Sequence, residues 1–408
     1  MNSFDTTNGL GLDFYLSEMS VSDLHGGGLT LQRILGEDLS GIPRFIHAGR
    51  FARDVPPAPD LRSRSEFVVS VLEEHLTQRF IGCRPSHWLL TRRPVRMRQI
   101  RQIAWRLQNL SPDKEVLAGL VCPQAQVVIH ALELLKSVRK VRYISWMMDD
   151  HVVSYTSGRW VYPPVFHQVF RKHLREADSV FVISPIMAEL YQREFGVRST
   201  VLFGPGGDLP GEAREVPSND GTLRIGYFGR IWSWQLEGLC CFAAALDPGR
   251  DRLDIYTPES ELPLALRLPS VMAKGFLPQQ EVRKRMLDYD AVLLPLSFSD
   301  AHRSLVELNI ATKMSEYLAS GTVTIAFGPS YAAMVRFLDP PGAACVVTDA
   351  SLKQWPSIRN RLLDVNYRRQ LLNAAKTLVQ AELSTAVMRR KWRVALAKLN
   401  GEKISATV

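Results

Sequence analysis

The sequence has few cysteines and no cysteine motif. Its 408 residues include five cysteines, an odd number, and none of them belongs to a C-x-x-C pair. Disulfide-stabilised secreted scaffolds and cysteine-based zinc sites both depend on grouped cysteines, so we expect neither here. The cysteine content favours a protein of a reducing compartment.

Long apolar runs are also missing. Residues 1–25 have neither a basic start nor an apolar centre, so we expect no signal peptide, and no uncharged apolar run is long enough to span a bilayer. We therefore predict a cytoplasmic chain. Hydrophobic residues make up 46% and charged residues 22%, which is ordinary for a globular protein, and the length suits two domains better than one.

The most informative stretch is 290–328, which reads strand, loop, helix, strand. Residues 291–296 form a short apolar run, 310–320 carry apolar side chains at helical spacing, and 322–327 are mostly β-branched or apolar. A strand-helix-strand unit implies a parallel sheet with helices on both faces. Ligands bind such sheets at the carboxyl ends of the strands, where the loop before this helix lies.

Two charged residues stand at the start of that helix. Lys313 and Glu316 are three residues apart and share a helix face, and unpaired backbone N–H groups at this end favour an anion. We expect a phosphate group against Asn309, Thr312 and Lys313, while Glu316 accepts hydrogen bonds from two neighbouring sugar hydroxyls. The alternative is an ordinary surface ion pair that stabilises the helix by roughly 0.3 kcal/mol.

A glycine-arginine pair opens the second half of the chain. After a Gly- and Pro-rich linker at 204–221, residues 223–228 are the expected first strand, Gly229 is its turn and a helix begins near Trp234. Arg230 follows the glycine directly and is placed to contact a phosphate group through two N–H donors. The alternative is an ordinary surface arginine.

Near the N-terminus, three consecutive glycines precede a helix. Residues 12–16 are the predicted first strand, and Gly27 and Gly28 lie in the connection to the helix. Because glycine has no Cβ, backbone there can approach a ligand closely. The alternative is a flexible loop.

Positive charge is concentrated in one segment. Residues 79–114 hold nine basic residues and one acidic residue, a balance of +8 against +9 for the whole chain, with Trp88 and Trp105 among them. An anionic membrane surface attracts such a segment by roughly 1 kcal/mol per basic residue. Nucleic acid or a solvated helix face are alternatives, but no nucleic-acid module is recognisable elsewhere, so we place the membrane ahead of nucleic acid.

A carboxylate pair and a histidine follow another predicted strand. Residues 126–130 and 142–147 are expected to be buried strands, and the second leads into Asp150 and His151. If the sheet is parallel, these side chains lie at its carboxyl edge, where chemistry takes place. The alternative is a structural role, in which an aspartate caps the next turn.

Two segments resemble a known family. TKMSEYLASGTVTIAFG, which contains Lys313 and Glu316, resembles the donor-site signature of GT-B glycosyltransferases, especially the bacterial family 4-like enzymes of surface-polysaccharide synthesis. ADSVFVISPIMAELYQREFGV resembles the last βα unit of a GT-B N-terminal domain. The resemblance covers about residues 10–400 and implies an α/β fold of two Rossmann-like domains whose parallel sheets face a cleft. It places an acceptor-side domain at 1–205, a nucleotide-sugar-binding domain at 206–385 and a helix that crosses back at 386–408.

The resemblance also implies roles for the charged residues of the second half. In the family, a lysine approaches the diphosphate, a glutamate holds the ribose and an arginine after the first glycine contacts the diphosphate. These roles fall on Lys313, Glu316 and Arg230. Relatives often have a second lysine where this chain has Gln235, and many have a glutamate eight positions before Glu316, where this chain has a leucine preceded by Glu307.

In the first half, the resemblance places Gly27 and Gly28 opposite the donor phosphates. Asp150 or His151 would act as a base on the acceptor hydroxyl of an inverting enzyme, whereas the histidine would contact the donor sugar in a retaining one. The two adjacent aspartates, Asp149 and Asp150, do not match the D-x-D metal motif of the other glycosyltransferase fold. No essential metal and no cofactor are therefore expected.

The sequence thus predicts a metal-independent glycosyltransferase that moves a sugar from a nucleotide-sugar donor to a saccharide or lipid-linked acceptor. We expect a cytoplasmic protein that makes peripheral contact with the inner face of a membrane through 79–114 and does not bind nucleic acid. Two alternatives stay open: a nucleotide-sugar epimerase of the same fold, and a catalytically silent GT-B-like binding protein.

Overall fold

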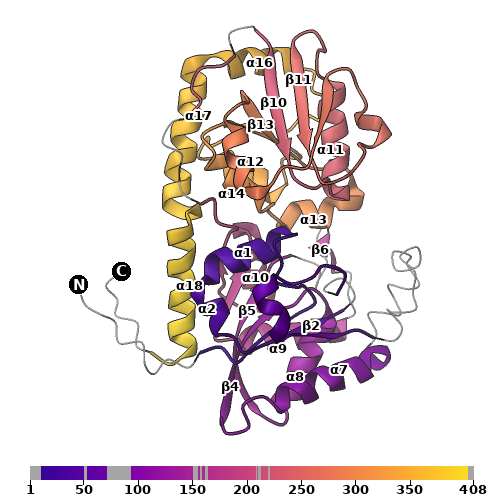
Figure 1. Cartoon of the computed structure of the whole chain (residues 1–408), viewed down its shortest axis with the longest axis vertical. Helices are drawn as coiled ribbons and strands as arrows, with labels where there is room; N and C mark the ends of the chain where they lie inside the picture. The colour runs from indigo at the N-terminus through magenta and orange to yellow at the C-terminus, as the bar shows by residue number, and fades with distance from the viewer. Residues whose placement is uncertain are drawn as a thin grey trace, which may run out of the picture.

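The computed structural model contains two parallel β-sheets, one in each half of the chain, and the two halves lie one above the other (Figure 1). The first half is at the bottom of this view and the second at the top. The structure describes residues 11–49, 53–70, 93–149, 155–156, 159–160, 164–207, 209, 213–218 and 221–402.

The first half is built on seven parallel strands in the order β3-β2-β1-β4-β5-β8-β9. They are β1 (Phe14–Ser17), β2 (Arg44–Ala48), β3 (Ser65–Val68), β4 (Val116–Cys122), β5 (Lys140–Met147), β8 (Ser179–Val182) and β9 (Thr200–Val201). A separate antiparallel pair consists of β6 (Tyr155–Thr156) and β7 (Arg159–Trp160). The helices are α1 (Gly26–Leu35), α2 (Glu37–Gly41), α7 (Arg93–Gln108), α8 (Gln126–Lys136), α9 (Pro164–Glu176) and α10 (Pro185–Phe195).

Both faces of this sheet are apolar, because helices cover both. Phe14 and Leu16 of β1 pack with the buried side chains of α7 and α8, whereas Tyr15 packs with those of α1 on the opposite face. This alternation follows from the two-residue period of a strand. The strand predicted at 12–16 is observed as β1, and the parallel sheet confirms the predicted α/β class.

The strand predicted at 126–130 is wrong. These residues form the start of α8, and the strand lies just before it, as β4. The cause is burial: every residue from Gln126 to Leu132 is buried, so the first two turns of α8 have no exposed face. A helix that is buried all round cannot be distinguished from a buried strand by hydrophobic periodicity over a short window.

The second half is built on six parallel strands in the order β12-β11-β10-β13-β14-β15. They are β10 (Leu223–Phe228), β11 (Asp251–Tyr256), β12 (Val271–Gly275), β13 (Ala291–Pro295), β14 (Val323–Phe327) and β15 (Cys345–Val347). The helices include α11 (Ser233–Ala244), α12 (Gln279–Met286), α13 (Arg303–Leu308), α14 (Lys313–Leu318), α15 (Ala333–Leu338) and α16 (Trp355–Leu363). The helix predicted at 310–320 is therefore shorter than expected, because α14 begins only at Lys313.

The chain ends in a long helical segment that runs beside both halves, drawn in yellow in Figure 1. It consists of α17 (Val365–Leu378), a π-helical turn (Val379–Leu383) and α18 (Thr385–Leu399). Trp392 of α18 is buried, and its indole Nε1 donates to Asp38 Oδ2 at 2.8 Å. Its ring also lies 6.2 Å from that of Phe181 in β8, between the ring centroids. The last helix thus supplies core side chains to the first half.

Direct contacts join the two halves. The carbonyl of Leu308 in α13 accepts a hydrogen bond of 2.5 Å from Ser184 Oγ, the N-cap of α10. The Leu308 side chain is buried in the core of the first half, among residues such as Met147 and Phe170. The Leu308 side chain thus joins the two halves, at the position where the resemblance implied a glutamate.

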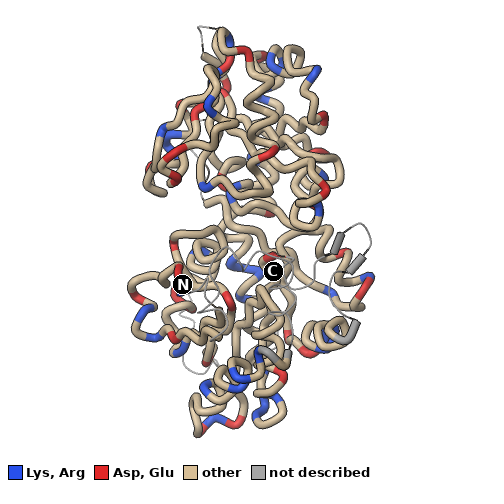
Figure 2. The backbone as a smooth tube through the Cα atoms, turned by 90° about the vertical axis from the view of Figure 1, so that its right-hand side faces the viewer, with Lys and Arg blue, Asp and Glu red and all other residues tan. Residues whose placement is uncertain are grey.

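Charge is mixed over the molecule. Figure 2 shows Lys and Arg in both halves, interspersed with Asp and Glu. Of the basic segment predicted at 79–114, residues 79–92 lie outside the described part, and α7 forms most of the remainder. On α7, Arg106 pairs with Glu66 at 3.0 Å. Within the described residues, no helix is both long and apolar enough to cross a membrane.

Candidate functional site

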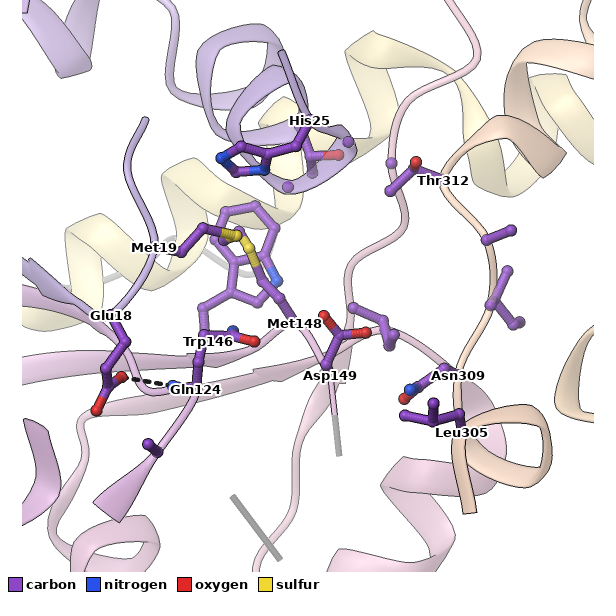
Figure 3. Close-up of a pocket in the computed structure, with 18 of the residues that line it drawn as sticks. Glu18, Met19, His25, Gln124, Trp146, Met148, Asp149, Leu305, Asn309 and Thr312 are labelled. Carbon is purple, nitrogen blue, oxygen red and sulfur yellow. Dashed lines mark hydrogen bonds between the residues drawn. The ribbon is translucent and has the colours of Figure 1, made fainter. Parts of the chain in front are cut away.

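A cavity of about 720 Å³ lies between the two halves. Its wall in the first half comes from the carboxyl ends of β1, β4 and β5 and from the start of α1, and its wall in the second half comes from the start of α11 and the α13–α14 connection (Figure 3). A cavity of this size holds a small-molecule ligand. Each sheet thus faces the cavity with the carboxyl ends of its strands, which is where parallel sheets bind ligands.

Lys313 is not among the residues that line the cavity, although its neighbour Thr312 is. Its Nζ donates to Tyr227 Oη at 2.9 Å and lies 3.4 Å from Gln235 Oε1. The same Nζ is 4.2 Å from the centroid of the Tyr227 ring, so the ring face also stabilises the charge. Burial nevertheless lowers the pKa of Lys313 to about 7, because a charged ammonium is costly to desolvate.

Arg230 lies in the loop after β10, which packs against the Lys313 side chain. Its carbonyl accepts a 2.8 Å hydrogen bond from Tyr227 Oη, the group that also contacts Lys313 Nζ. The preceding Gly229 has φ +114°, a conformation that favours glycine, and its Cα faces the Lys313 ammonium. The Arg230 guanidinium is exposed and lies 3.9 Å from Glu259, over the ring of Trp232. The turn after β10 therefore brings the backbone of Arg230 to the hydroxyl that binds Lys313, while the Arg230 guanidinium points toward Glu259 and Trp232.

Gln235 occupies the position at which relatives often have a second lysine. Its side chain is only 1% exposed, and its Oε1 accepts from Tyr227 Oη at 3.1 Å as well as approaching Lys313 Nζ. A lysine here would set two ammonium groups side by side with no carboxylate between them. Gln235 instead supplies an acceptor, so one cation is held by two neutral oxygens.

Glu316 is engaged across the junction between the halves. Its Oε1 accepts from Arg33 Nη1 of α1 at 2.5 Å and from Gln279 Nε2 of α12 at 3.0 Å. Both contacts fall on the same carboxylate oxygen. The side chains of Arg33 and Glu316 are 31% and 23% exposed, so water reaches this pair and a polar ligand can compete with it.

The predicted glycines lie in the first turn of α1. Gly27 lines the cavity, whereas Gly28 is buried and a Cβ on it would collide with the Ser22 backbone. The neighbouring Gly26 fits against Thr312 of the other half with no room for a side chain. His25 caps this helix, because its Nδ1 accepts from the Gly28 N–H at 3.1 Å. Gly26 therefore allows close contact between α1 and the second half, whereas Gly27 and Gly28 allow close packing within the first half.

The remaining predicted residues fall into two groups. Asn309 and Thr312 line the cavity, and Thr312 is the N-cap residue of α14. Asp150 and His151 lie outside the described residues. Their neighbour Asp149 is described and lines the cavity (Figure 3).

Glu307 does not take part in the described lining of the cavity, which includes Leu305 and Asn309 on either side of it. Its Oε2 instead accepts from Arg303 Nε at 3.1 Å, one turn earlier on α13. Among the described residues, no three His, Cys, Asp or Glu side chains gather to hold a metal ion. The absence of an essential metal stays a prediction.

Sequence reasoning missed Glu18, which follows β1 directly and lines the cavity. It accepts hydrogen bonds from the backbone N–H groups of Gln124 at 2.7 Å and Val128 at 3.1 Å. Burial raises the pKa of Glu18 to about 7, and these N–H donors oppose the shift. The signal was available, because the residue stands at the carboxyl end of a predicted parallel strand.

No protein-family profile matches the sequence, and no curated protein sequence matches it. Solved structures do match the fold over nearly the whole chain. A glycosyltransferase from Rickettsia africae ESF-5 is 14% identical with a TM-score of 0.58, and the match covers 95% of this chain and 98% of that one. Sucrose-phosphate synthase from Thermosynechococcus elongatus is 13% identical with a TM-score of 0.63, covering 96% and 99% of the two chains.

A third similar structure is HepE from Anabaena in complex with UDP-glucose. It is 13% identical with a TM-score of 0.58, and the match covers 94% of this chain and 99% of that one. At these identities the likeness concerns the fold. The two parallel-sheet domains, the cavity between them and these similar structures confirm that the chain has the GT-B fold.

Proposed function

We propose that the chain transfers a sugar from a nucleotide-sugar donor to a hydroxyl group of an acceptor. The observation that supports this most is the bond of Lys313 Nζ to the Tyr227 hydroxyl, which also donates to the Arg230 carbonyl, in two loops that reach the cavity through Trp232 and Thr312. Tyr227 and Lys313 are 86 positions apart in the sequence, so the fold itself creates this contact.

The chemistry needs fixed cations. In the transfer, an acceptor oxygen bonds to the anomeric carbon of the sugar, the bond from that carbon to the phosphate oxygen breaks, and the negative charge of the departing nucleoside diphosphate increases. Fixed cations stabilise that charge as it develops. Lys313 supplies a point charge held in place by Tyr227 and Gln235, and Arg230 supplies a planar group suited to two phosphate oxygens.

The donor is a nucleoside diphosphate sugar, and a uridine nucleotide is the first to test, since the similar HepE structure contains UDP-glucose. Glu316 is proposed to bind the ribose hydroxyls. It would exchange its hydrogen bond with Arg33 for these hydroxyls, which is feasible because the pair is partly exposed. Catalysis is proposed to require no metal.

The acceptor is proposed to be a saccharide or a lipid-linked acceptor, and Asp150 or His151 are retained as candidate bases. Contact with an anionic membrane surface through 79–114 is part of the proposal. On the described portion, α7 exposes Arg98, Arg101 and Trp105 to solvent, a pattern that suits the headgroup region. Binding to vesicles with and without anionic lipid tests this part by itself.

The test of the main proposal uses the purified full chain and a panel of UDP- and GDP-sugars. Release of nucleoside diphosphate, with a rise in melting temperature on adding the matching diphosphate, is expected. Conversion of the donor to another sugar nucleotide without any acceptor would indicate an epimerase instead. Failure of every nucleotide to bind, in a chain that melts cooperatively, would leave only the silent binding protein. Addition of a chelator should leave turnover unchanged.

A further inference from the structure

The first-half wall of the cavity contains polar groups that take no part in the proposed contacts to the nucleotide-sugar donor. They cluster where β1, β4 and β5 end, around Glu18, Gln124, Gln126 and Trp146, and all four line the cavity. Figure 3 labels Glu18, Gln124 and Trp146. Glu18 is held in place by backbone N–H groups of Gln124 and of Val128 in the first turn of α8. The cluster is therefore a rigid part of the sheet edge.

Three donors in this cluster are enclosed without a hydrogen-bond partner among the described residues. They are Nε2 of Gln124, Nε2 of Gln126 and Nε1 of Trp146. Trp146 is fully buried and Gln126 is 8% exposed. An enclosed N–H group without a partner destabilises the folded protein, so the two amide donors in this wall favour a ligand that supplies acceptors to them.

A ligand in the cavity can reach the amide groups. Gln124 and Gln126 each turn their amide by rotation about the terminal torsion, which has broad energy wells. The surfaces beside them are apolar: Met19, which packs against Gly27, and Met148. A wall of apolar surface with a few fixed donors matches a sugar ring, which has C–H faces and a hydroxyl edge.

We propose that Glu18, Gln124 and Gln126 form a binding subsite for an uncharged sugar ring. The two amides donate to hydroxyl oxygens of the ring, and a ring hydroxyl donates to the Glu18 carboxylate. The assignment of this ring as the acceptor rests on the proposed function, whereas the binding of the ring itself does not.

Charge distinguishes this ligand from an anionic one. The pKa of Glu18 is raised to about 7, so near neutral pH the carboxyl group exists in both protonation states. A hydroxyl group can donate to the ionised form and accept from the protonated form, but a phosphate or carboxylate meets repulsion from the ionised form. The other titratable side chains of the described wall are Arg96, His130, His25 and Asp149. Arg96 already donates to Ser70 and Gln99, at 2.8 and 3.1 Å.

The experiment is ligand-observed saturation-transfer NMR on the full chain with UDP present. The probes are the methyl glycosides of glucose, galactose, mannose and N-acetylglucosamine, with glucose 6-phosphate as the anionic comparator. At least one neutral glycoside should receive saturation, and Gln126→Ala should weaken its binding about 3- to 10-fold, the usual effect of one lost hydrogen bond. Glu18→Ala should weaken it similarly. The control Gln192→Ala, on the exposed side of α10, should change nothing.

The melting temperature separates binding from a structural role. Because Gln126 Nε2 has no protein partner to lose, Gln126→Ala should melt no lower than the unmodified chain. Equal glycoside binding by Gln126→Ala and the unmodified chain would overturn the subsite, as would stronger binding of glucose 6-phosphate than of every glycoside. If UDP gives a clear signal and no glycoside does, the subsite is overturned and the proposed function is not. A glycoside signal with no nucleotide binding would contradict the proposed function and support the subsite.

Discussion

The two walls of the cavity differ in how completely their polar groups are paired. On the second-half side, Lys313, Tyr227 and Gln235 bond to one another next to the lining residues Trp234 and Thr312, so this side keeps its geometry without a ligand. In the first half, Gln124 and Gln126 have amide donors with no partner among the described residues. The difference suggests that the second half is organised in advance for one common ligand, while the first half is completed by its ligand.

The largest expected effect comes from removing the Lys313 ammonium on the second-half side of the cavity. Lys313→Ala should lower turnover by about 100- to 1000-fold, the usual effect of losing one electrostatic donor to developing charge. The melting temperature should stay close to that of the unmodified chain, because burial already penalises the ammonium. Steady-state transfer rates measure the effect, and Lys284→Ala on exposed α12 is the matched control. Near-normal turnover would remove the lysine from the mechanism.

A change of pH weakens the same wall without a mutation. The pKa of Lys313 in the free protein is about 7, so its ammonium is mostly present below pH 7 and mostly lost above it. An anionic ligand favours the charged form of Lys313, so UDP affinity should fall about 10-fold between pH 7 and pH 9. A change of this size corresponds to the loss of one hydrogen bond from a charged group. Calorimetry measures the affinity. Lys313→Arg should flatten this dependence, because arginine keeps its proton, and an equally steep curve for that variant would contradict the assignment.

A smaller effect is expected when the cation is kept but its support is removed. Tyr227→Phe deletes the hydroxyl that contacts Lys313 Nζ and the Arg230 carbonyl. Turnover should fall about 3- to 10-fold, the effect of one hydrogen bond, and the pH dependence of UDP binding should shift because the environment of Lys313 changes. Tyr289→Phe removes another hydroxyl of the same half, which bonds to Asp254, and serves as the control. Identical pH curves for Tyr227→Phe and the unmodified chain would show that the wall is not organised by this hydroxyl.

The smallest effect concerns the contact that joins the walls. Arg33→Ala frees Glu316 for the ribose, so UDP affinity should rise about 2- to 5-fold, in keeping with a partly exposed ion pair. Arg369→Ala breaks a comparable surface pair with Glu215 inside the second half and should leave affinity unchanged. A loss of affinity in Arg33→Ala would mean that Arg33 itself contacts the nucleotide.

The fold was largely predictable because parallel strands buried on both faces stand out as short apolar runs. The strands predicted at 223–228, 291–296 and 322–327 match β10, β13 and β14 within a residue or two. The first half was harder to predict. Burial on every side gave the start of α8 the pattern of a strand, and the buried run from Gln126 to Leu132 left no helical periodicity to mark the boundary after β4.

The candidate site was predictable only where a local rule applied. The turn after β10 and the loop before α14 were singled out because ligands bind at strand ends, and the same rule would have singled out Glu18. Contacts between distant residues carry no local signal: Arg33 and Glu316 are 283 positions apart. The contact between Gln235 and Lys313 was also not predictable. A glutamine in a helix sequence does not show whether its side chain accepts a hydrogen bond from a distant lysine.

The terminal helix has a consequence for biosynthesis. Met388, Trp392 and Leu399 fill the core of the first half, although they are made after the whole second half. During translation, the first half therefore waits with an unfilled core while some two hundred further residues emerge and the second half folds. A nascent chain halted before Thr385 should expose that apolar surface and recruit chaperones, and synthesis of the last helix should release them.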